Sequence, residues 1–309
     1  MPTKRTVSRR SFLRRSAAAA ATAVAAPAAS ALADQRAFSL RYIVGSSLYG
    51  RLKLDEIVPE VPKAGAAHLD VWPRPHGDQR EQIEAMGHEK FAAMLARHRV
   101  KLGILTHYDL GPFALGKELP VARKFGASMM ICMGMPRKKA DLGAFIERIK
   151  PHVDAAAEVG VTLGIENHGE SPDAIRRFAE AAKSKHLGVA LAPYHLPHDA
   201  AALARLIEDL GDKLVLFYAW QHGKGCMKKL PKDQELLQMP GRGPLDFGPL
   251  LAALRKIGYT GWTEIFMHPV PRGIPILPTA AEVTAEINRA RKHLDTLAGG
   301  RAAPRSNSP

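Results

Sequence analysis

The stretch Leu163-Gly164-Ile165-Glu166-Asn167-His168 reads as a short apolar strand that ends abruptly in a carboxylate, an amide and an imidazole. A second run of this kind, Gly261-Trp262-Thr263-Glu264-Ile265, follows much later in the chain. Buried strands that deliver polar groups at their C-terminal ends are typical of a (β/α)8 barrel, whose active site lies at that end. Either run alone fits an ordinary strand and loop; the two together favour the barrel.

The rest of the chain repeats one unit, an apolar β-branched run followed by a loop and an amphipathic segment. Strands are expected at residues 40–44, 67–71, 102–106, 128–132, 162–166, 187–191, 214–219 and 261–265. Helices are expected at residues 54–64 (interrupted by proline), 88–98, 119–125, 140–159, 172–182, 199–210, 245–257 and 280–297. Eight alternating units imply a parallel sheet that closes, so we predict an α/β fold, a single-domain TIM barrel.

A doubly wound open sheet is the alternative fold. It would need a glycine-rich phosphate turn after the first strand, and Gly45-Ser46-Ser47 does not have that pattern.

The N-terminus has the three parts of an export signal in the right order. Ser8-Arg9-Arg10-Ser11-Phe12-Leu13 has the form of a twin-arginine motif, an Ala-rich run spans residues 17–29, and Ala31-Leu32-Ala33 offers small residues for cleavage. We therefore expect residues 1–33 to be a signal peptide, 34–298 the barrel and 299–309 a disordered tail. A disordered basic N-terminus with a chance arginine pair is the alternative.

This interpretation has consequences for location and partners. The protein would be periplasmic or otherwise extracytoplasmic, with the twin-arginine export machinery as a partner. The Ala-rich run is shorter than the ~20 residues that a membrane span needs, so no stable span is expected after cleavage.

Charge and cysteine content exclude other classes. The full chain has 44 basic and 30 acidic residues, and residues 1–33 contain six of the basic and none of the acidic ones, which leaves a net charge of +8. That balance does not by itself indicate nucleic-acid binding, and we expect none. Two cysteines, Cys132 and Cys226, are too few for a disulfide scaffold or a metal cluster, although one bridge between them stays open.

From about Ile43 to Leu297 the chain resembles the sugar phosphate isomerase/epimerase family, the xylose isomerase-like barrels. The resemblance rests on Ile165-Glu166-Asn167-His168, Ala192-Pro193-Tyr194-His195, Pro240-Gly241-Arg242-Gly243-Pro244-Leu245-Asp246-Phe247 and Ile257-Gly258-Tyr259-Thr260-Gly261-Trp262-Thr263-Glu264. It implies that Glu166 and Glu264 bind one divalent metal and act as the acid/base pair. An Asp after the sixth strand and a His on the seventh would complete such a metal site.

The chain departs from that pattern at both of the remaining ligands. Ala192 stands where the family has Asp, and Tyr218 where it has His. Hard cations such as manganese and magnesium need several oxygen ligands, so we predict that neither is held in the family manner. Either no metal is bound, or a softer, zinc-like ion is held by Glu166, Glu264 and His195.

Two carboxylates on opposite sides of a barrel mouth can remove a proton from one face of a carbon and return one to the other. The enediolate formed midway needs positive charge or hydrogen-bond donors, for which His195, His107, Lys224 and Arg242 are candidates. The other predicted substrate contacts are His168, His222 and an apolar platform of Trp72 and Trp220. The alternatives are a salt-bridged structural role for the glutamates, satisfied histidines and core tryptophans.

We therefore predict an enzyme that isomerises or epimerises a sugar or keto-sugar with a Glu166/Glu264 acid-base pair. One alternative is a lyase or hydrolase that acts on oxidised glycosides by proton abstraction and elimination. The other is a carbohydrate-binding barrel without catalysis. In all three cases the partner is a small carbohydrate.

Replacing Arg9 and Arg10 together by Lys tests the export prediction. Because the arginine pair is the recognised element of the motif, the precursor should accumulate uncleaved in the cytoplasm. Cell fractionation with detection of precursor and mature forms measures this. Processing of the double variant at the normal rate would contradict the twin-arginine interpretation.

Overall fold

The computed structural model describes residues 38–108, 110–222 and 228–299. The expected signal peptide, Lys224, Cys226 and residues 300–309 of the expected tail lie outside these ranges. Eight parallel strands form a closed barrel in chain order, so the predicted fold is confirmed. The strands are β1 (Arg41–Gly45), β2 (His68–Val71), β3 (Lys101–Thr106), β4 (Met129–Met133), β5 (Thr162–Glu166), β6 (Leu187–Leu191), β7 (Leu214–Ala219) and β8 (Trp262–Ile265).

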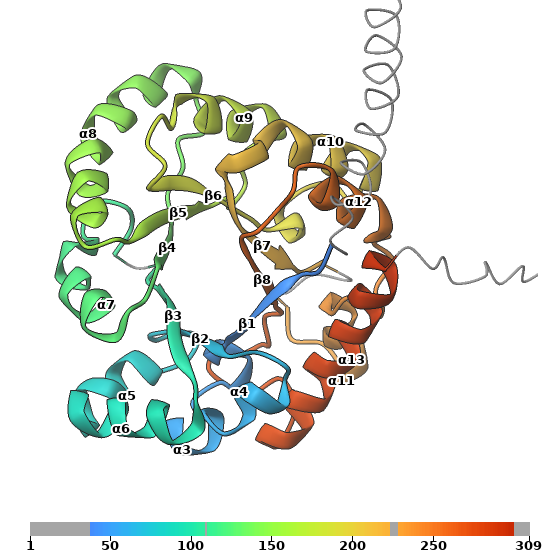
Figure 1. Ribbon diagram of the computed structural model, residues 1–309. Helices are drawn as coiled ribbons and strands as arrows, with labels where there is room; N and C mark the ends of the chain where they lie inside the picture. The colour runs from blue at the N-terminus through green and yellow to red at the C-terminus, as the bar shows by residue number, and fades with distance from the viewer. Residues whose placement is uncertain (1–37, 109, 223–227, 300–309) are drawn as a thin grey trace, which may run out of the picture. The chain divides into compact units, whose positions relative to one another are not determined.

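The helices form a ring around the strands (Figure 1). They are α3 (Leu54–Ile57), α4 (Glu60–Lys63), α5 (Gln79–Met86), α6 (His88–His98), α7 (Leu119–Phe125), α8 (Lys139–Glu158), α9 (Pro172–Ala181), α10 (Ala200–Leu210), α11 (Lys232–Glu235), α12 (Gly248–Lys256) and α13 (Ala280–Ala298). Among the described residues, no helix combines the length and the apolar character needed to cross a bilayer.

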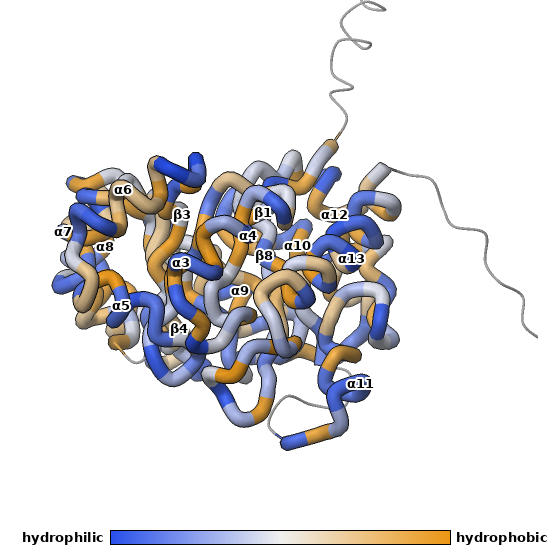
Figure 2. Tube along the Cα trace, turned by 90° about the horizontal axis from the view of Figure 1, so that it is seen from below, coloured by the Kyte–Doolittle hydropathy of each residue, from blue (hydrophilic) through white to orange (hydrophobic). Residues whose placement is uncertain are grey.

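The strands are apolar because both of their faces are covered. All five residues of β6 are buried, and Cys132 of β4 is a buried free thiol. In the hydropathy view, β3 is a largely apolar segment, whereas the helices mix apolar and polar positions (Figure 2). Gly164 and Gly188 pair across β5 and β6, and a Cβ at Gly188 would lie 2.4 Å from a methyl carbon of Val215.

The predicted strands match the observed ones to within one residue. The proline-interrupted helix expected at residues 54–64 is confirmed as the short helices α3 and α4, which are separated at Pro59, a residue with no N–H to continue the helical hydrogen bonds. The other helices differ from the prediction in three places, the first being α11, which was not expected. Helix α5 was not predicted; it is separated from α6 by Gly87, whose φ is +83°. The helix expected at residues 245–257 begins only at Gly248.

Two buried glutamines hold the segment between β7 and α12 in place. Gln221 donates to the Met239 carbonyl at 3.0 Å and accepts from the Leu245 amide at 2.7 Å. Gln238 accepts from the Trp220 indole and the His268 amide, both at 3.0 Å. These bonds join the loops after β7 and β8 above the C-terminal end of the barrel.

The Asp199 carboxylate caps α10 by accepting from the amides of Ala201 and Ala202, both at 3.0 Å. Asp199→Ala removes this acceptor and should lower the free energy of unfolding by about 0.5–2 kcal/mol. Chemical denaturation measures the loss. Asp199→Asn is the matched control, because it keeps an acceptor oxygen and should stay close to the parent protein. Equal losses in the two variants would contradict the capping role.

Candidate active site at the C-terminal end of the barrel

Glu166 ends β5 with its carboxylate fully buried inside the barrel. Its Oε1 atom lies 3.5 Å from Nδ1 of His168 and 3.6 Å from Nε2 of His195. Its Oε2 atom accepts a hydrogen bond from the hydroxyl of Tyr108, which follows β3. The carboxylate is therefore contacted by residues from three different strand ends.

These neighbours decide the charge of Glu166. Burial alone would raise the pKa of its carboxyl group, but the imidazoles of His168 and His195 outweigh burial and hold that pKa below its ordinary value of 4.5. A carboxyl group whose pKa in the folded protein lies below its ordinary value has its ionised form stabilised. Glu166 is therefore a carboxylate at neutral pH.

The pKa of Glu264 on β8 is shifted in the opposite direction. Glu264 is fully buried, and so is Asp70 of β2. Burial and the adjacent Asp70 carboxyl raise the pKa of Glu264 well above its ordinary value, with a further contribution from Glu166. Two neighbouring buried carboxyl groups cannot both ionise without a large penalty. Glu264 therefore keeps its proton to a higher pH than an ordinary carboxyl group does.

The family arrangement of metal ligands does not fit this chain. Ala192 follows β6 and offers only a methyl group, and Tyr218 of β7 is 1% exposed with a pKa raised by burial well above 10.0. A neutral phenol and a methyl group replace a carboxylate and an imidazole, so a hard cation loses both charge and ligand atoms.

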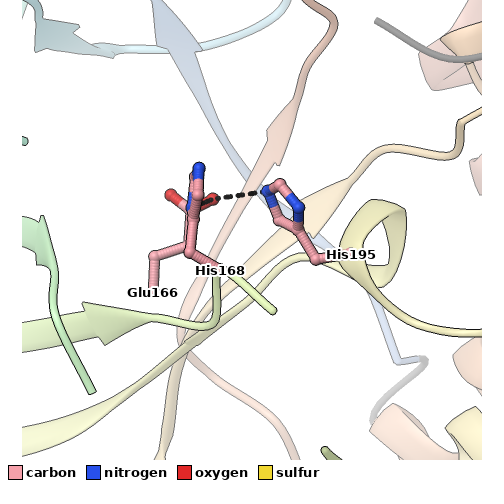
Figure 3. Close-up of side chains that lie close together, drawn as sticks. All are labelled: Glu166, His168 and His195. Atoms are coloured by element: carbon pink, nitrogen blue, oxygen red, sulfur yellow. Dashed lines mark ion pairs between the residues drawn. The ribbon is translucent and has the colours of Figure 1, made fainter. Parts of the chain in front are cut away.

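A different group of three residues has the donor atoms for a metal ion. Ligand atoms of Glu166, His168 and His195 all lie within 4.8 Å of one another, and Figure 3 shows the imidazoles beside the carboxylate. Glu166 Oε1, His168 Nδ1 and His195 Nε2 are buried without a hydrogen-bond partner among the described residues. The group keeps Glu166 and His195 from the predicted set and has His168 in place of Glu264.

Asn167 fixes the relative position of the two strand ends that carry this group. Its side chain accepts from the Ala192 amide at 2.7 Å and donates to the Ala192 carbonyl at 3.1 Å. The turn Pro193–His195 follows Ala192 directly, so the two hydrogen bonds between the Asn167 side chain and the Ala192 backbone hold His195 beside Glu166. The side chains of His168 and His195 are 30% and 15% exposed and reach toward the surface.

Trp72 and Trp220, the predicted platform, lie in the packed core, and their contact with a substrate stays a prediction. Both side chains are buried, at 0% and 1% exposure. Trp72 stacks on Phe266 with ring centroids 5.1 Å apart, and Tyr194 covers Trp220 at 3.9 Å. The tryptophans therefore pack under the mouth of the barrel because neighbouring rings shield them from solvent.

Three other predicted contacts have partners away from Glu166 and Glu264. His107 lies 3.4 Å from the Glu118 carboxylate, and the His222 ring stacks on His198 at 3.7 Å. Arg242 makes two hydrogen bonds to Glu286 of α13, at 2.7 and 2.6 Å. The structure therefore gives Arg242 a structural partner instead of a place in the barrel interior.

Sequence reasoning did not assign a role to Asp70, Tyr108 or His76. Asp70 lies within the strand expected at residues 67–71, and Tyr108 directly follows His107 in the sequence. His76 is 6% exposed, contacts Tyr108 and His268 by its ring, and has a pKa that burial lowers to about 3. The signal that could have found Asp70 is its acidic side chain at the C-terminal end of a buried strand.

The chain belongs to the xylose isomerase-like TIM barrel family, whose model matches residues 60–293. A search of curated protein sequences finds no match to this chain. Among solved structures, the chain is similar to D-psicose 3-epimerase from Clostridium cellulolyticum H10, solved with D-tagatose. That match has a TM-score of 0.63 and 14% identity, and covers 84% of this chain and 99% of the other.

An L-ribulose 3-epimerase is similar at a TM-score of 0.62 and 14% identity, with coverage of 88% of this chain and all of the other. A fusion of a xylose isomerase-like barrel with 4-hydroxyphenylpyruvate dioxygenase has a TM-score of 0.65 and 14% identity, over 84% of this chain. The chain spans 43% of that fusion protein. At these identities the likeness establishes the fold.

Proposed function

We propose that this protein is a carbohydrate isomerase or epimerase that moves a proton at a carbon next to a carbonyl group. The observation that carries the proposal is a pair of buried carboxyl groups, Glu166 and Glu264, at two strand ends of one barrel mouth in surroundings of opposite kind. The imidazoles lower the pKa of Glu166 despite burial, whereas burial and Asp70 raise the pKa of Glu264. Carboxyl groups whose surroundings drive their pKa values apart are the usual acid and base of such reactions.

The proton-transfer step balances between these two groups. Glu166 takes the proton from carbon, and the electrons of the broken C–H bond move into an enediolate. Glu264 then gives its proton to carbon and is left as a carboxylate, while Glu166 is left protonated. Exchange of one proton from Glu166 and one to Glu264 restores the starting state.

Family membership and the sugar epimerases among similar structures support a keto-sugar as the substrate class. The export signal expected from the sequence favours a free sugar or glycoside over a sugar phosphate, because sugar phosphates are mostly cytoplasmic. Elimination on an oxidised glycoside uses the same carboxyl groups and stays the alternative reaction.

We also infer that Glu166, His168 and His195 hold a zinc-like ion. Zinc bonds of about 2.0–2.1 Å in a tetrahedron place neighbouring ligand atoms about 3.3 Å apart. The two distances to Glu166 Oε1, 3.5 and 3.6 Å, are close to that value. One carboxylate and two imidazoles with an open position form a donor set that zinc enzymes use. A bound ion would polarise a substrate oxygen, and Glu166 Oε2, held by Tyr108, would stay available for proton transfer.

Hydrogen exchange into the substrate tests the proposed reaction. Purified protein is incubated in D2O with free ketopentoses, ketohexoses and 3-keto sugars, and deuterium next to the carbonyl is followed by NMR. Glu166→Gln and Glu264→Gln should each slow exchange roughly 10²–10⁴-fold, the usual contribution of an acid/base group. The matched control is Glu286→Gln, since Glu286 is buried and ion-paired on α13 away from the barrel interior.

Other outcomes separate the alternatives. An unsaturated product without simple exchange would favour elimination. Sugar binding that is unchanged in both glutamine variants, with no exchange in the parent protein, would favour a binding barrel and overturn the enzyme proposal.

The metal is tested by elemental analysis of protein purified without chelators. We expect about one equivalent of zinc, and its loss in His168→Ala and His195→Ala because each removes one of three protein ligands. Glu264→Gln should keep the ion. Manganese or magnesium retained in both histidine variants would contradict the assignment.

A further inference from the structure

Two histidine rings from different loops lie against each other at the mouth of the barrel. His76 belongs to the loop after β2 and His268 to the loop after β8, and their ring centroids are 4.6 Å apart. The two loops are in contact, since a Cβ at Gly273 would lie 2.9 Å from the Pro75 carbonyl oxygen. Both histidines are buried, with exposures of 6% and 5%. Neither has a part in the proton transfer proposed above.

Aromatic rings surround this histidine pair, with centroid distances between 5.2 and 5.5 Å. These rings are Trp72 and Tyr108 against His76, and Phe266 and Trp220 against His268. The Tyr108 hydroxyl donates to Glu166 and the Trp220 indole N–H donates to Gln238, so both of these polar groups have other partners. The surroundings of the two imidazoles are therefore mostly carbon surface.

The imidazole of His76 has an unpaired nitrogen in these surroundings. Its Nε2 atom is buried and has no hydrogen-bond partner among the described residues. Buried polar side-chain atoms are almost always hydrogen-bonded, because leaving one unpaired is costly. Burial, with a smaller effect of the Arg272 charge, lowers the pKa of His76 to about 3, so the ring is neutral and has one N–H donor and one acceptor nitrogen. A group that fills this vacant hydrogen bond has to come from a ligand or a water molecule.

Tyr108 links the histidine pair to the candidate active site. Its ring contacts His76 at 5.4 Å and His168 at 5.7 Å, and its hydroxyl donates to Glu166. The pair is thus one tyrosine ring away from the carboxylate that is proposed to take the proton. A hexose extends over several bonds beyond its reacting carbon, so a hydroxyl group farther along the carbon chain comes within reach of His76.

Gln238 holds the second histidine of the pair in place. Its Oε1 atom accepts from the His268 amide and from the Trp220 indole, both at 3.0 Å, and its Nε2 atom donates to the His268 carbonyl at 2.9 Å. Gln238 is itself 1% exposed. Both backbone polar groups of His268 are therefore fixed by one buried side chain. A group that is fixed before the ligand arrives loses little further freedom on binding.

We propose that His76 and His268 form a subsite for one hydroxyl group of the sugar and select the sugars that carry this group. The subsite rests on the proposed function, because that function makes the ligand a sugar. A hydroxyl group both donates and accepts hydrogen bonds, and the nitrogens of a neutral imidazole offer it one acceptor and one donor. An analogue that lacks the hydroxyl leaves the buried nitrogen unpaired, and sites built in this way reject such analogues.

An anionic substituent, such as a phosphate ester, is the competing ligand for this position. Arg272 lies in the same loop as His268, is exposed, and has a charge that acts on the His76 imidazole. Two imidazoles buried among aromatic rings favour the uncharged group, because an anion would lose its hydration there without a full countercharge. A phosphorylated sugar is therefore part of the test.

Binding of D-fructose, D-psicose, D-sorbose and D-tagatose to the purified protein is measured by NMR titration, which does not require turnover. Analogues of the tightest-binding sugar, each without one hydroxyl group, are then compared. One analogue should bind the parent protein roughly 10–100-fold more weakly than the complete sugar. His76→Phe keeps a ring in the packing and removes both nitrogens, so it should weaken binding of the complete sugar by a similar factor and leave binding of that analogue unchanged.

Further variants separate a subsite from a structural role. His268→Phe should act like His76→Phe, and His76→Gln should recover part of the affinity because its amide keeps a donor and an acceptor. In the exchange assay, His76→Phe should raise KM with little change in kcat, which is the pattern of lost uniform binding. His88→Phe is the matched control and should behave like the parent protein, since His88 lies on the outer helix α6 with its ring against Phe125.

If His76→Phe fails to fold, a crystal structure of the parent protein with the sugar decides, because a sugar oxygen should lie within hydrogen-bond distance of His76 Nε2. The subsite is overturned if none of the four sugars binds, if the parent and His76→Phe bind the complete sugar equally well, or if the 6-phosphate binds more tightly than the free sugar through His76. Deuterium exchange with an affinity that is insensitive to His76→Phe keeps the proposed function and refutes the subsite. Binding through His76 without exchange does the reverse.

Discussion

Burial of three carboxyl groups inside one barrel is the constraint on which the mouth of this protein depends. A buried ionised carboxylate without a partner costs several kcal/mol. The cost is reduced in two ways. Glu166 is surrounded by imidazoles and a phenol from neighbouring strand ends, whereas Asp70 accepts a hydrogen bond from Thr106 and burial together with Asp70 raises the pKa of Glu264. The histidines and aromatic rings at this end of the barrel surround the carboxyl groups and exclude solvent from them.

The fold could be predicted because each strand carries its own evidence. Parallel strands covered on both faces read as apolar runs, and eight such runs in alternation with amphipathic segments have few ways to pack. Glu166 and Glu264 could be chosen for the same reason, since each directly ends a buried run. Helix α5 could not be predicted, because it is short and mostly polar and follows a proline-rich loop.

The partners of these glutamates could not be predicted, because they come from other strands at a register that the sequence does not state. Asp70 and Glu264 meet only when β1 brings β2 and β8 together. Arg242 illustrates the opposite error. Arg242 is the basic residue of a motif that lies close to β8 in sequence, but its guanidinium pairs with Glu286 on the last helix. Local chemistry identified the residue type and gave no information about its partner.

The substitutions at positions 192 and 218 change the character of the site. With a methyl and a phenol in place of a carboxylate and an imidazole, the inner part of the mouth has fewer groups that can bind a metal ion. The imidazoles of His168 and His195 lie beside Glu166 instead. The donor set for a soft ion and the buried carboxyl groups of Asp70 and Glu264 therefore occupy different strand ends, β5 with β6 and β2 with β8.

The closing strand pair has a consequence for how the chain reaches this structure. Arg41 pairs with Trp262, so one edge of β1 stays unpaired until β8, more than two hundred residues later in the chain, has been synthesised. Closing a loop of this length has an entropic cost, so such a long-range contact forms late. Until β8 is available, β1 and β7 are open sheet edges, and the carboxyl pair does not exist. These two edges therefore stay open to pairing with other chains until the barrel closes.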